Sequence, residues 1–202
     1  MSRFIRLLLL MLLPALAWGA PDAPVVLVFG DSLAAGYGLP QSQSWAYLLG
    51  KQLAPRYRVV NASVSGETSS GGLTRIESAL EQHRPAIVMI ELGANDGLRG
   101  LPLADTKRNL AAIIGKAKQA KARVLLIGMQ LPPNFGAAYA RRFSTLYSEL
   151  ASENKVPLLP FLLEGFADKR ELFQADMLHP TAQAQPMIVD TVAKALEPLL
   201  KP

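Results

Sequence analysis

Cysteine is absent from this chain of 202 residues, and histidine occurs only twice. The lack of thiols excludes a disulfide framework, so the fold must be held by its hydrophobic core, which a chain of this length can bury in one domain. Zinc and iron sites are built largely from cysteine and histidine, and too few of these residues are present for such a site. We therefore expect a single domain with no metal.

The chain also lacks an apolar run long enough to cross a membrane. Arg3 and Arg6 precede the apolar stretch Leu7 to Trp18, whose twelve residues fall short of the ~20 that span a bilayer. A basic start, a short apolar run and small residues after it are typical of a secretory signal peptide. We expect residues 1–23 to be removed, which leaves a mature domain of residues 24–202 that is periplasmic or secreted and has no membrane span.

Basic residues are in mild excess and form no continuous block. The formal net charge of +5 falls to about +3 or +4 without the signal peptide, depending on whether Asp22 leaves with it. The densest basic stretch, Lys116 to Arg123, begins late in an expected helix, where cations offset the helix dipole. Because aromatic residues make up only 7% of the chain as well, the composition does not support nucleic-acid binding.

Short apolar runs alternate with helical patterns in the rest of the chain. The expected strands are Val25–Phe29, Arg56–Ala62, Ala86–Leu92, Arg123–Met129 and, at an edge because of its prolines, Val156–Phe161. Apolar spacing predicts helices over Ser44–Leu53, Leu73–Leu80, Asp105–Ala117, Ala138–Leu150 and Ala182–Leu199, with Ser44 capping the first and Asp105 or Thr106 the third. This alternation predicts an α/β fold, with a parallel sheet covered by helices on both faces.

A serine follows the first expected strand. The apolar run from Val25 to Phe29 is broken by Gly30-Asp31-Ser32, which places the Ser32 hydroxyl just past the carboxyl end of a strand. Open α/β sheets bind ligands outside those ends, so Ser32 is a candidate nucleophile. The alternative is that Ser32 only caps the next helix.

A nucleophilic serine needs a base, and His179 is the better candidate of the two histidines. Asp176 precedes it by three residues, and a carboxylate at that spacing can hold the tautomer and orientation of an imidazole. His83 lies before Arg84-Pro85 at the end of an expected helix, where an imidazole is simply a C-terminal cation or a solvated residue. The alternative for Asp176 and His179 is two loop residues with no shared role.

Two further loops offer hydrogen-bond donors for a developing oxyanion. Gly66 follows the second expected strand, and its lack of a Cβ lets the backbone amide approach a ligand closely. Asn95 follows the third strand and carries a side-chain amide with two N–H groups. Each could be an ordinary turn residue. Together with Ser32 and His179, they would bring nucleophile, base and donors to one edge of the sheet.

Four sequence blocks together resemble the signature of an enzyme family. Gly30-Asp31-Ser32-Leu33, Gly66, Gly93-Ala94-Asn95-Asp96 and Asp176-Met177-Leu178-His179 resemble, in order and along nearly the whole mature chain, the blocks of the GDSL, or SGNH, hydrolases. The resemblance is strongest to exported bacterial esterases with thioesterase, arylesterase and lysophospholipase activity. The elbow Gly-x-Ser-x-Gly of the rival α/β-hydrolases is missing, because its fifth position is Ala34.

The resemblance implies a mechanism, a fold and a class of substrate. It makes Ser32 the nucleophile, His179 the base and Asp176 its orienting carboxylate, with the Ser32 amide, the Gly66 amide and the Asn95 side chain as oxyanion donors. It implies a three-layer α/β/α, flavodoxin-like fold with a five-stranded parallel sheet in the order 2-1-3-4-5. We expect a monomer that hydrolyses acyl thioesters, aryl esters or lysophospholipids and needs no cofactor.

Apolar residues in two loops near the expected site predict a groove for an acyl or aryl group. These residues are Leu98, Leu101, Leu131, Pro133 and Phe135. For any one of them the alternative is a place in the core. Two other functions stay open: the same catalytic groups acting on an acetylated sugar of the envelope, or a noncatalytic exported module that binds a phosphate or sugar. Phosphate-loop and dinucleotide motifs are absent after the first strand, which speaks against the module.

Overall fold

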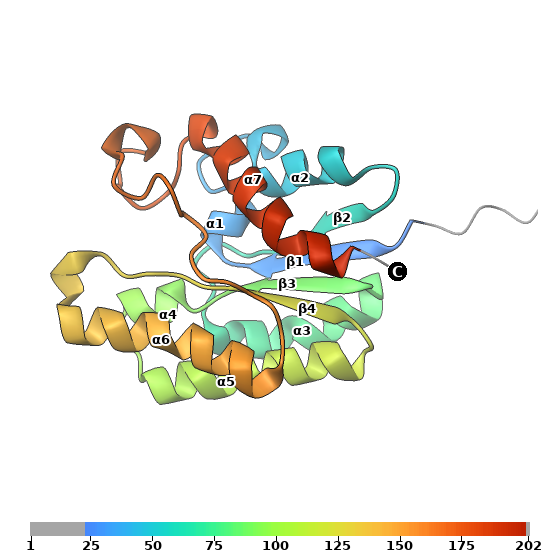
Figure 1. Cartoon of the computed structure of the whole chain (residues 1–202), viewed down its shortest axis with the longest axis horizontal. Helices are drawn as coiled ribbons and strands as arrows, with labels where there is room; N and C mark the ends of the chain where they lie inside the picture. Colours follow the sequence, from blue (N-terminus) through green and yellow to red (C-terminus); the bar gives the residue numbers. More distant parts are fainter. Residues whose placement is uncertain (1–22, 201–202) are drawn as a thin grey trace, which may run out of the picture.

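A five-stranded parallel sheet forms the centre of the molecule, seen in a computed structural model that describes residues 23–200 (Figure 1). The strands are β1 (Val25–Gly30), β2 (Arg58–Asn61), β3 (Ile87–Glu91), β4 (Arg123–Ile127) and β5 (Leu158–Leu159). Their order across the sheet is β2-β1-β3-β4-β5, and every neighbouring pair is parallel. The predicted strand order is therefore confirmed. The predicted signal peptide, apart from Ala23, lies outside the described residues.

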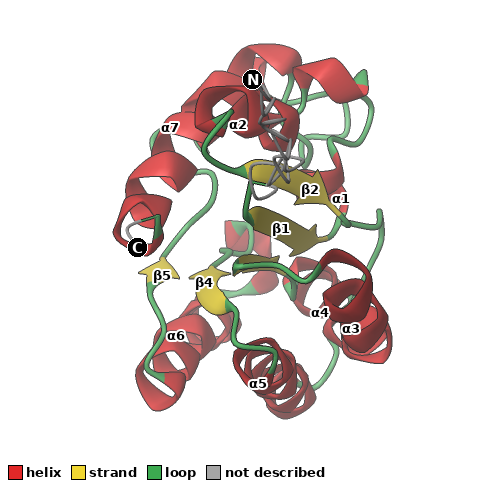
Figure 2. Cartoon of the chain, turned by 90° about the vertical axis from the view of Figure 1, so that its right-hand side faces the viewer, coloured by secondary structure: helices red, strands yellow, loops and turns green. Residues whose placement is uncertain are grey.

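Helices cover both faces of this sheet. In the described part of the chain they are α1 (Ser32–Ala35), α2 (Trp45–Leu53), α3 (Ser69–His83), α4 (Ala94–Leu98), α5 (Leu103–Gln119), α6 (Ala137–Asn154) and α7 (Gln185–Leu196). Figures 1 and 2 show α2 and α7 on one face and α3, α5 and α6 on the other. The expected three-layer α/β/α architecture is confirmed, and it explains why the central strands are apolar throughout.

The two central strands are completely enclosed. All six residues of β1 and all five of β3 are buried, including Glu91 at the end of β3. Strands buried on both faces read as continuous apolar runs, which is why the sequence pattern located them well. Glu91 is the exception, a carboxyl group inside a layer of apolar side chains.

Helix caps match the sequence prediction at one helix and differ at another. Ser44 caps α2 as expected, because its Oγ accepts the N–H of Tyr47 at 3.3 Å. Helix α5, in contrast, starts after Pro102, so the prediction of Asp105 or Thr106 as its cap is wrong. Asp105 lies inside the first turn, where an acid favours the helix dipole, and Thr106 is fully buried.

Sequence periodicity did not predict several short elements correctly. Helices α1 and α4 have only four and five residues, too few to show a helical period. The edge strand β5 keeps only Leu158 and Leu159 of the predicted run, because Pro157 and Pro160 flank them. The predicted helix Ala182–Leu199 is divided into a 3₁₀ turn, α7 and a second 3₁₀ turn.

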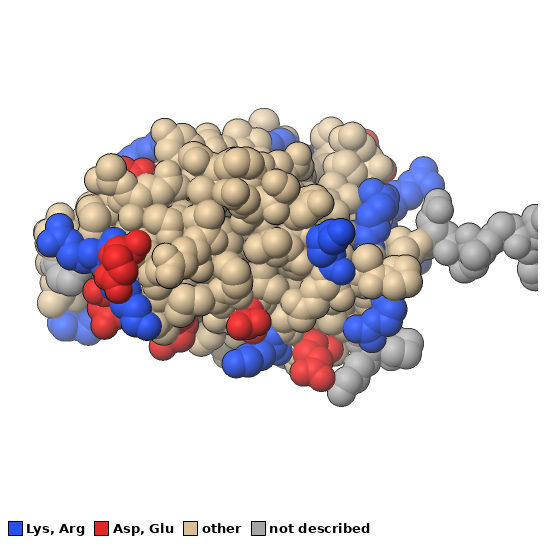
Figure 3. Space-filling model, turned by 90° about the horizontal axis from the view of Figure 1, so that it is seen from above, with Lys and Arg blue, Asp and Glu red and all other residues tan. Residues whose placement is uncertain are grey.

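The surface carries charges of both signs. On the face shown in Figure 3, basic and acidic side chains lie close together at the left-hand end, mostly basic side chains lie at the right-hand end, and much of the middle is uncharged. Within residues 23–200, no helix has the length and apolar character that a bilayer crossing requires. The face seen in this view offers no extended basic field of the kind that nucleic acids select.

Candidate active site

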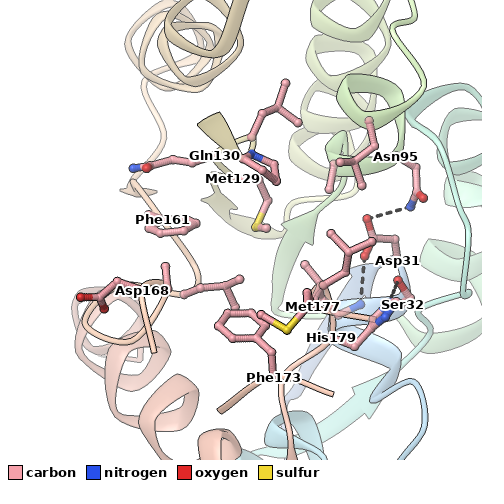
Figure 4. A pocket seen from close by; sticks show the side chains of 18 residues that line it. Asp31, Ser32, Asn95, Met129, Gln130, Phe161, Asp168, Phe173, Met177 and His179 are labelled. Atoms are coloured by element: carbon pink, nitrogen blue, oxygen red, sulfur yellow. Dashed lines mark hydrogen bonds between the residues drawn. The ribbon is translucent and has the colours of Figure 1, made fainter. Parts of the chain in front are cut away.

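Ser32, His179 and Asp176 form one continuous hydrogen-bonded chain beyond the carboxyl end of β1. Nε2 of His179 lies 2.8 Å from Oγ of Ser32, and Nδ1 of the same ring lies 2.7 Å from Oδ2 of Asp176. Figure 4 shows Ser32 and His179 side by side at one end of a pocket. Because 147 positions separate these two residues in the sequence, only the fold brings them together.

A tight turn holds Asp176 in place for this contact. Its Oδ1 accepts the N–H groups of Leu178 at 2.9 Å and His179 at 3.0 Å. Met177, which follows Asp176, adopts a left-handed φ of 59°. Partial burial alone would raise the pKa of Asp176, but the amides of His179 and Leu178 and the imidazole lower it to about 2. An ionised Asp176 accepts a hydrogen bond from the Nδ1–H group of His179, which leaves the Nε2 lone pair to accept the Ser32 hydroxyl.

An aromatic ring that the sequence did not single out packs on the imidazole. The ring centroids of Tyr37 and His179 lie 4.5 Å apart, at an angle of 37° between the planes. Gln174 joins the loop of Tyr37 to the turn of His179. Its side-chain amide donates to the Tyr37 carbonyl at 2.8 Å, and its backbone N–H donates to the His179 carbonyl at 2.8 Å. Tyr37 comes from a glycine-rich loop without periodicity, so no sequence signal marked it.

Asp31, and not Ser32, caps the short helix α1, which begins with the candidate nucleophile Ser32. Oδ1 of Asp31 accepts the N–H of Leu33 at 3.0 Å, and Ser32 is the first residue of α1. The alternative interpretation of Ser32 as a helix cap is therefore wrong, because the preceding residue already performs that task. The Ser32 hydroxyl is left to face His179.

Glu91 lies directly behind this turn, as a fully buried acid next to another acid. Its Oε2 accepts the N–H of Asp31 at 3.2 Å, and a Cβ on Gly30 would lie 2.6 Å from the same oxygen. Burial raises the pKa of Asp31 to about 6, whereas hydrogen bonds from Leu33 and Asn95 oppose this change. Burial and the nearby Asp31 charge raise the pKa of Glu91 well above its usual range. The only sequence signal was an acid at the end of an apolar strand.

Replacing Glu91 with glutamine should remove a pH-dependent penalty on folding. Because the pKa values of Asp31 and Glu91 are raised, the folded protein holds more protons than the unfolded chain. Its free energy of unfolding therefore falls as the pH rises from the ordinary carboxyl range through about 6 and beyond. Glutamine keeps the shape and an acceptor for the Asp31 N–H but carries no charge. We expect Glu91→Gln to raise the Tm by ~5 °C near pH 8 and by less near pH 5.

Melting curves at both pH values measure this effect. Glu77→Gln is the matched control, because Glu77 is an exposed acid that pairs with Lys116 on the surface, and it should follow the wild type. If Glu91→Gln and wild type melted together near pH 8, the buried carboxyl would carry no such penalty.

Gly66 and Asn95, two of the three predicted oxyanion donors, lie in the segments that follow β2 and β3, next to the Ser32 turn. Gly66 follows β2 in a left-handed conformation with φ of 79°, and Asn95 lies in α4 after β3. Nδ2 of Asn95 donates to Oδ2 of Asp31 at 3.1 Å and to the Glu67 carbonyl at 2.9 Å. Since β2, β1 and β3 are parallel neighbours in the sheet, the segments that follow these strands begin side by side. The Asn95 amide thus already donates to two acceptors, so an oxyanion would have to share a hydrogen of this amide with Asp31 or with the Glu67 carbonyl.

The residue after Asn95 anchors the α4 segment in the core. Asp96 is 2% exposed and accepts bonds from the Ser69 N–H at 2.8 Å, the Ser69 hydroxyl at 2.5 Å and the Thr106 hydroxyl at 3.2 Å. Ser69 begins α3 and Thr106 lies in α5, so Asp96 joins three helices. These bonds fix the backbone from which the Asn95 side chain projects.

A cavity of about 510 Å³ opens beside Ser32. Its apolar lining includes Leu98, Leu131, Phe161, Leu163, Phe173 and Met177. Asp168 and Gln130 lie at the end far from Ser32 (Figure 4). Most of the residues that line it are apolar, so the cavity suits an apolar group, and its ionisable lining residues are Asp31, Asp168 and His179.

The predicted groove residues divide between this cavity and other places. Leu98 and Leu131 line it. Leu101 instead lines a separate surface hollow, because the chain turns at Gly100, whose φ is 65°. Phe135 packs partly buried against the core, at the end of the 3₁₀ helix Pro133–Phe135.

Several lining residues come from the long segment between β5 and α7, in which the sequence analysis assigned a role only to Asp176 and His179. Phe161, Leu163 and Phe173 lie in this segment, and it also contains the Asp176–His179 turn. The segment has no helical or strand period that could have predicted its inward faces. Within residues 23–200, no group of three or more His, Asp or Glu side chains is placed to hold a metal ion.

Comparisons with known proteins agree with this geometry. The model of the GDSL-like Lipase/Acylhydrolase family matches residues 28–185. The chain is 49% identical over 181 residues to "Esterase TesA" of Pseudomonas aeruginosa, covering 88% of this chain and 90% of that protein. It is 44% identical over 185 residues to "Thioesterase 1/protease 1/lysophospholipase L1" of Escherichia coli K12, covering 92% and 89%. The solved structure "Crystal Structure of TesA" superimposes with a TM-score of 0.84 at 48% identity, covering 87% of this chain and 99% of that one.

Proposed function

The chain belongs to the GDSL-like lipase/acylhydrolase family and is a hydrolase of ester bonds, and we propose that it cleaves acyl esters and thioesters through an acyl-enzyme on Ser32. The observation that carries the proposal is the hydrogen-bonded chain from Ser32 through His179 to Asp176, with contacts of 2.8 Å and 2.7 Å. This order of nucleophile, base and orienting carboxylate is the arrangement that activates a serine hydroxyl.

In the first half of the reaction, Oγ of Ser32 attacks the carbonyl carbon of the substrate. Nε2 of His179 takes the hydroxyl proton as the new C–O bond forms, and ionised Asp176 stabilises the resulting imidazolium through Nδ1. His179 then gives this proton to the leaving alcohol or thiol, and the acyl group remains on Ser32. The second half repeats these steps with water as the nucleophile, and releases a carboxylic acid and free Ser32.

Three donors are proposed to stabilise the negative charge on the substrate oxygen. They are the backbone amides of Ser32 and Gly66 and the side chain of Asn95. Their positions just after the neighbouring strands β1, β2 and β3 support this role, and so does the anchoring of α4 by Asp96. A preorganised donor stabilises the transition state more than the bound ester and therefore raises kcat.

The cavity supports a substrate with a single acyl chain or a small aryl group. Its walls are apolar between the Ser32–His179 pair and the Asp168 end, and its volume falls in the range of small-molecule sites. We propose long-chain thioesters, lysophospholipids and aryl esters as substrates. The runner-up is an acetylated sugar of the envelope, which needs the same catalytic groups but no long apolar cavity.

Leu98→Trp should separate these substrates, because a larger side chain fills the cavity that an acyl chain occupies. We expect kcat/KM for a long-chain thioester or lysophospholipid to fall by ~10-fold or more, and kcat/KM for a short acetate ester to change little. Leu101→Trp is the matched control, since Leu101 lines a different hollow. If the wild type hydrolysed acetylated sugars faster than long-chain substrates, the acetylated sugar would be the better proposal for the substrate class.

We also propose that the mature enzyme acts outside the cytoplasm after loss of residues 1–23. The basic and apolar character of those residues supports export. The intact mass of the exported protein tests the cleavage. A monomer is the proposed catalytic unit, because residues of one chain build the whole site.

A further inference from the structure

Arg75 is a partly buried cation behind the proposed oxyanion site, and the reaction above does not use it. It lies on α3, and its side chain is 25% exposed. Nε donates to Oε2 of Glu67 at 2.6 Å, Nη1 to the Ala62 carbonyl at 2.6 Å and Nη2 to the Gly30 carbonyl at 3.3 Å. Its Cζ also lies 4.0 Å from the centre of the buried Phe29 ring. The guanidinium is therefore held on its edges and on its face.

The three acceptors belong to the segments that carry the nucleophile and the Gly66 donor. Gly30 ends β1, two positions before Ser32. Ala62 follows β2, where the loop that contains Gly66 begins, and Glu67 is the neighbour of Gly66. A planar group with donors in a fixed fork sets the spacing of these segments in a way that a lysine ammonium cannot.

Glu67 extends this connection to Asn95. Its carbonyl accepts Nδ2 of Asn95 at 2.9 Å, and its side chain, 13% exposed, accepts the Thr68 N–H at 3.2 Å. Glu67 can lie against α3 because Gly71 has no side chain. A Cβ at Gly71 would fall 1.9 Å from Oε1 of Glu67. Arg75, Glu67 and Asn95 thus form one linked network.

From this arrangement we infer that Arg75 is a positioning residue that fixes the Gly66 and Asn95 donors relative to Ser32. It acts through Glu67 and the Gly30 and Ala62 carbonyls and touches no reacting atom. The inference rests on the proposed function, since it assumes that Gly66 and Asn95 bind the oxyanion. Without the guanidinium, the Gly66 loop keeps the bond from the Val64 N–H to the Gly30 carbonyl at 3.0 Å but loses the side-chain link between Glu67, Ala62 and Gly30. A shift of ~1 Å in such a group can cost ~10²-fold in rate.

Arg75→Met should lower kcat by ~10- to 10²-fold and change KM by less than ~3-fold. The rate is expressed per active site, counted by complete labelling of Ser32 with an organophosphorus probe, so loss of folded protein does not enter the result. Arg108→Met is the matched control, because Arg108 pairs with Asp105 at 2.8 Å on the surface of α5, and its kcat should stay at the wild-type value. An unchanged kcat per labelled site in Arg75→Met overturns the inference.

Glu67→Gln gives a second, milder test. It keeps the backbone carbonyl that binds Asn95 and the size of the side chain, but it weakens the bond to Arg75. We expect kcat to fall by ~3- to 10-fold, because glutamine keeps an oxygen that accepts from Arg75 but a neutral acceptor binds the guanidinium less strongly than a carboxylate does. If Arg75→Met does not fold, Glu67→Gln tests the inference in its place, and an unchanged kcat of Glu67→Gln overturns it. Failure of the probe to label Ser32 in the wild type would instead remove the proposed function.

Discussion

Ser32→Ala is expected to lower kcat by ~10³- to 10⁶-fold, because no other group can form the acyl-enzyme. His179 then has no hydroxyl to activate, although the oxyanion donors and the cavity remain. Turnover of a thioester by purified wild type and variant measures the loss. An organophosphorus probe should label Ser32 in the wild type, as peptide mass spectrometry can show, and should leave the variant unlabelled.

Ser44→Ala is the control for this experiment. Ser44 is as buried as a core residue and caps α2 through the Tyr47 N–H, so its loss should cost about 1 kcal/mol of stability and leave kcat unchanged. Labelling of a different serine, or turnover that disappears with EDTA, would contradict the serine mechanism.

Asn95→Ala is expected to lower kcat by ~10²- to 10³-fold, or ~3–4 kcal/mol, while KM moves much less. Attack by Ser32 transfers negative charge to the carbonyl oxygen, and a donor fixed at that place stabilises the transition state more than the bound ester. As a turn residue only, Asn95 would affect stability and leave kcat nearly unchanged. Both constants, measured with the Tm of the variant, separate the two roles.

Asn95→Ala should also lose stability, because it leaves Asp31 and the Glu67 carbonyl without a donor that they have in the wild type. Asn109→Ala separates the two effects. Asn109 donates to the Ser69 hydroxyl at 3.1 Å, one step away from the site, so it should lower the Tm and keep kcat. A folded Asn95→Ala variant that retains most of its kcat would take Asn95 out of the proposed oxyanion site.

The sheet and the meeting of its loops could be predicted because simple rules govern both. Strands β1 and β3 are buried on two faces, so their sequences are apolar up to the last residue of each strand and easy to locate. Parallel strands place all their carboxyl ends at one edge, which made the approach of Ser32, Gly66 and Asn95 foreseeable. The same rule does not predict the position of His179, which does not directly follow a strand. His179 was predicted from Asp176, three positions before it, and from the family signature.

The supporting residues were not predictable, because their roles depend on contacts between distant parts of the chain. Arg75 reads as an ordinary helix residue until the fold places it against β1 and the Gly66 loop. Glu91 is one position of a strand, and only the close contact with Asp31 makes it unusual. Tyr37 comes from an irregular loop. Local periodicity carries no information about such contacts.

The 147 positions between Ser32 and His179 also set the order in which the enzyme is completed during synthesis. The proposed nucleophile, Ser32, leaves the ribosome early, whereas the proposed base, His179, follows only after the last strand of the sheet. Helix α7 must then dock, since the Gln185 side chain accepts the Trp45 N–H of α2 at 2.9 Å. A nascent or truncated chain that stops before His179 lacks the proposed base, so we expect esterase activity only after synthesis has passed His179 and the two segments have folded together.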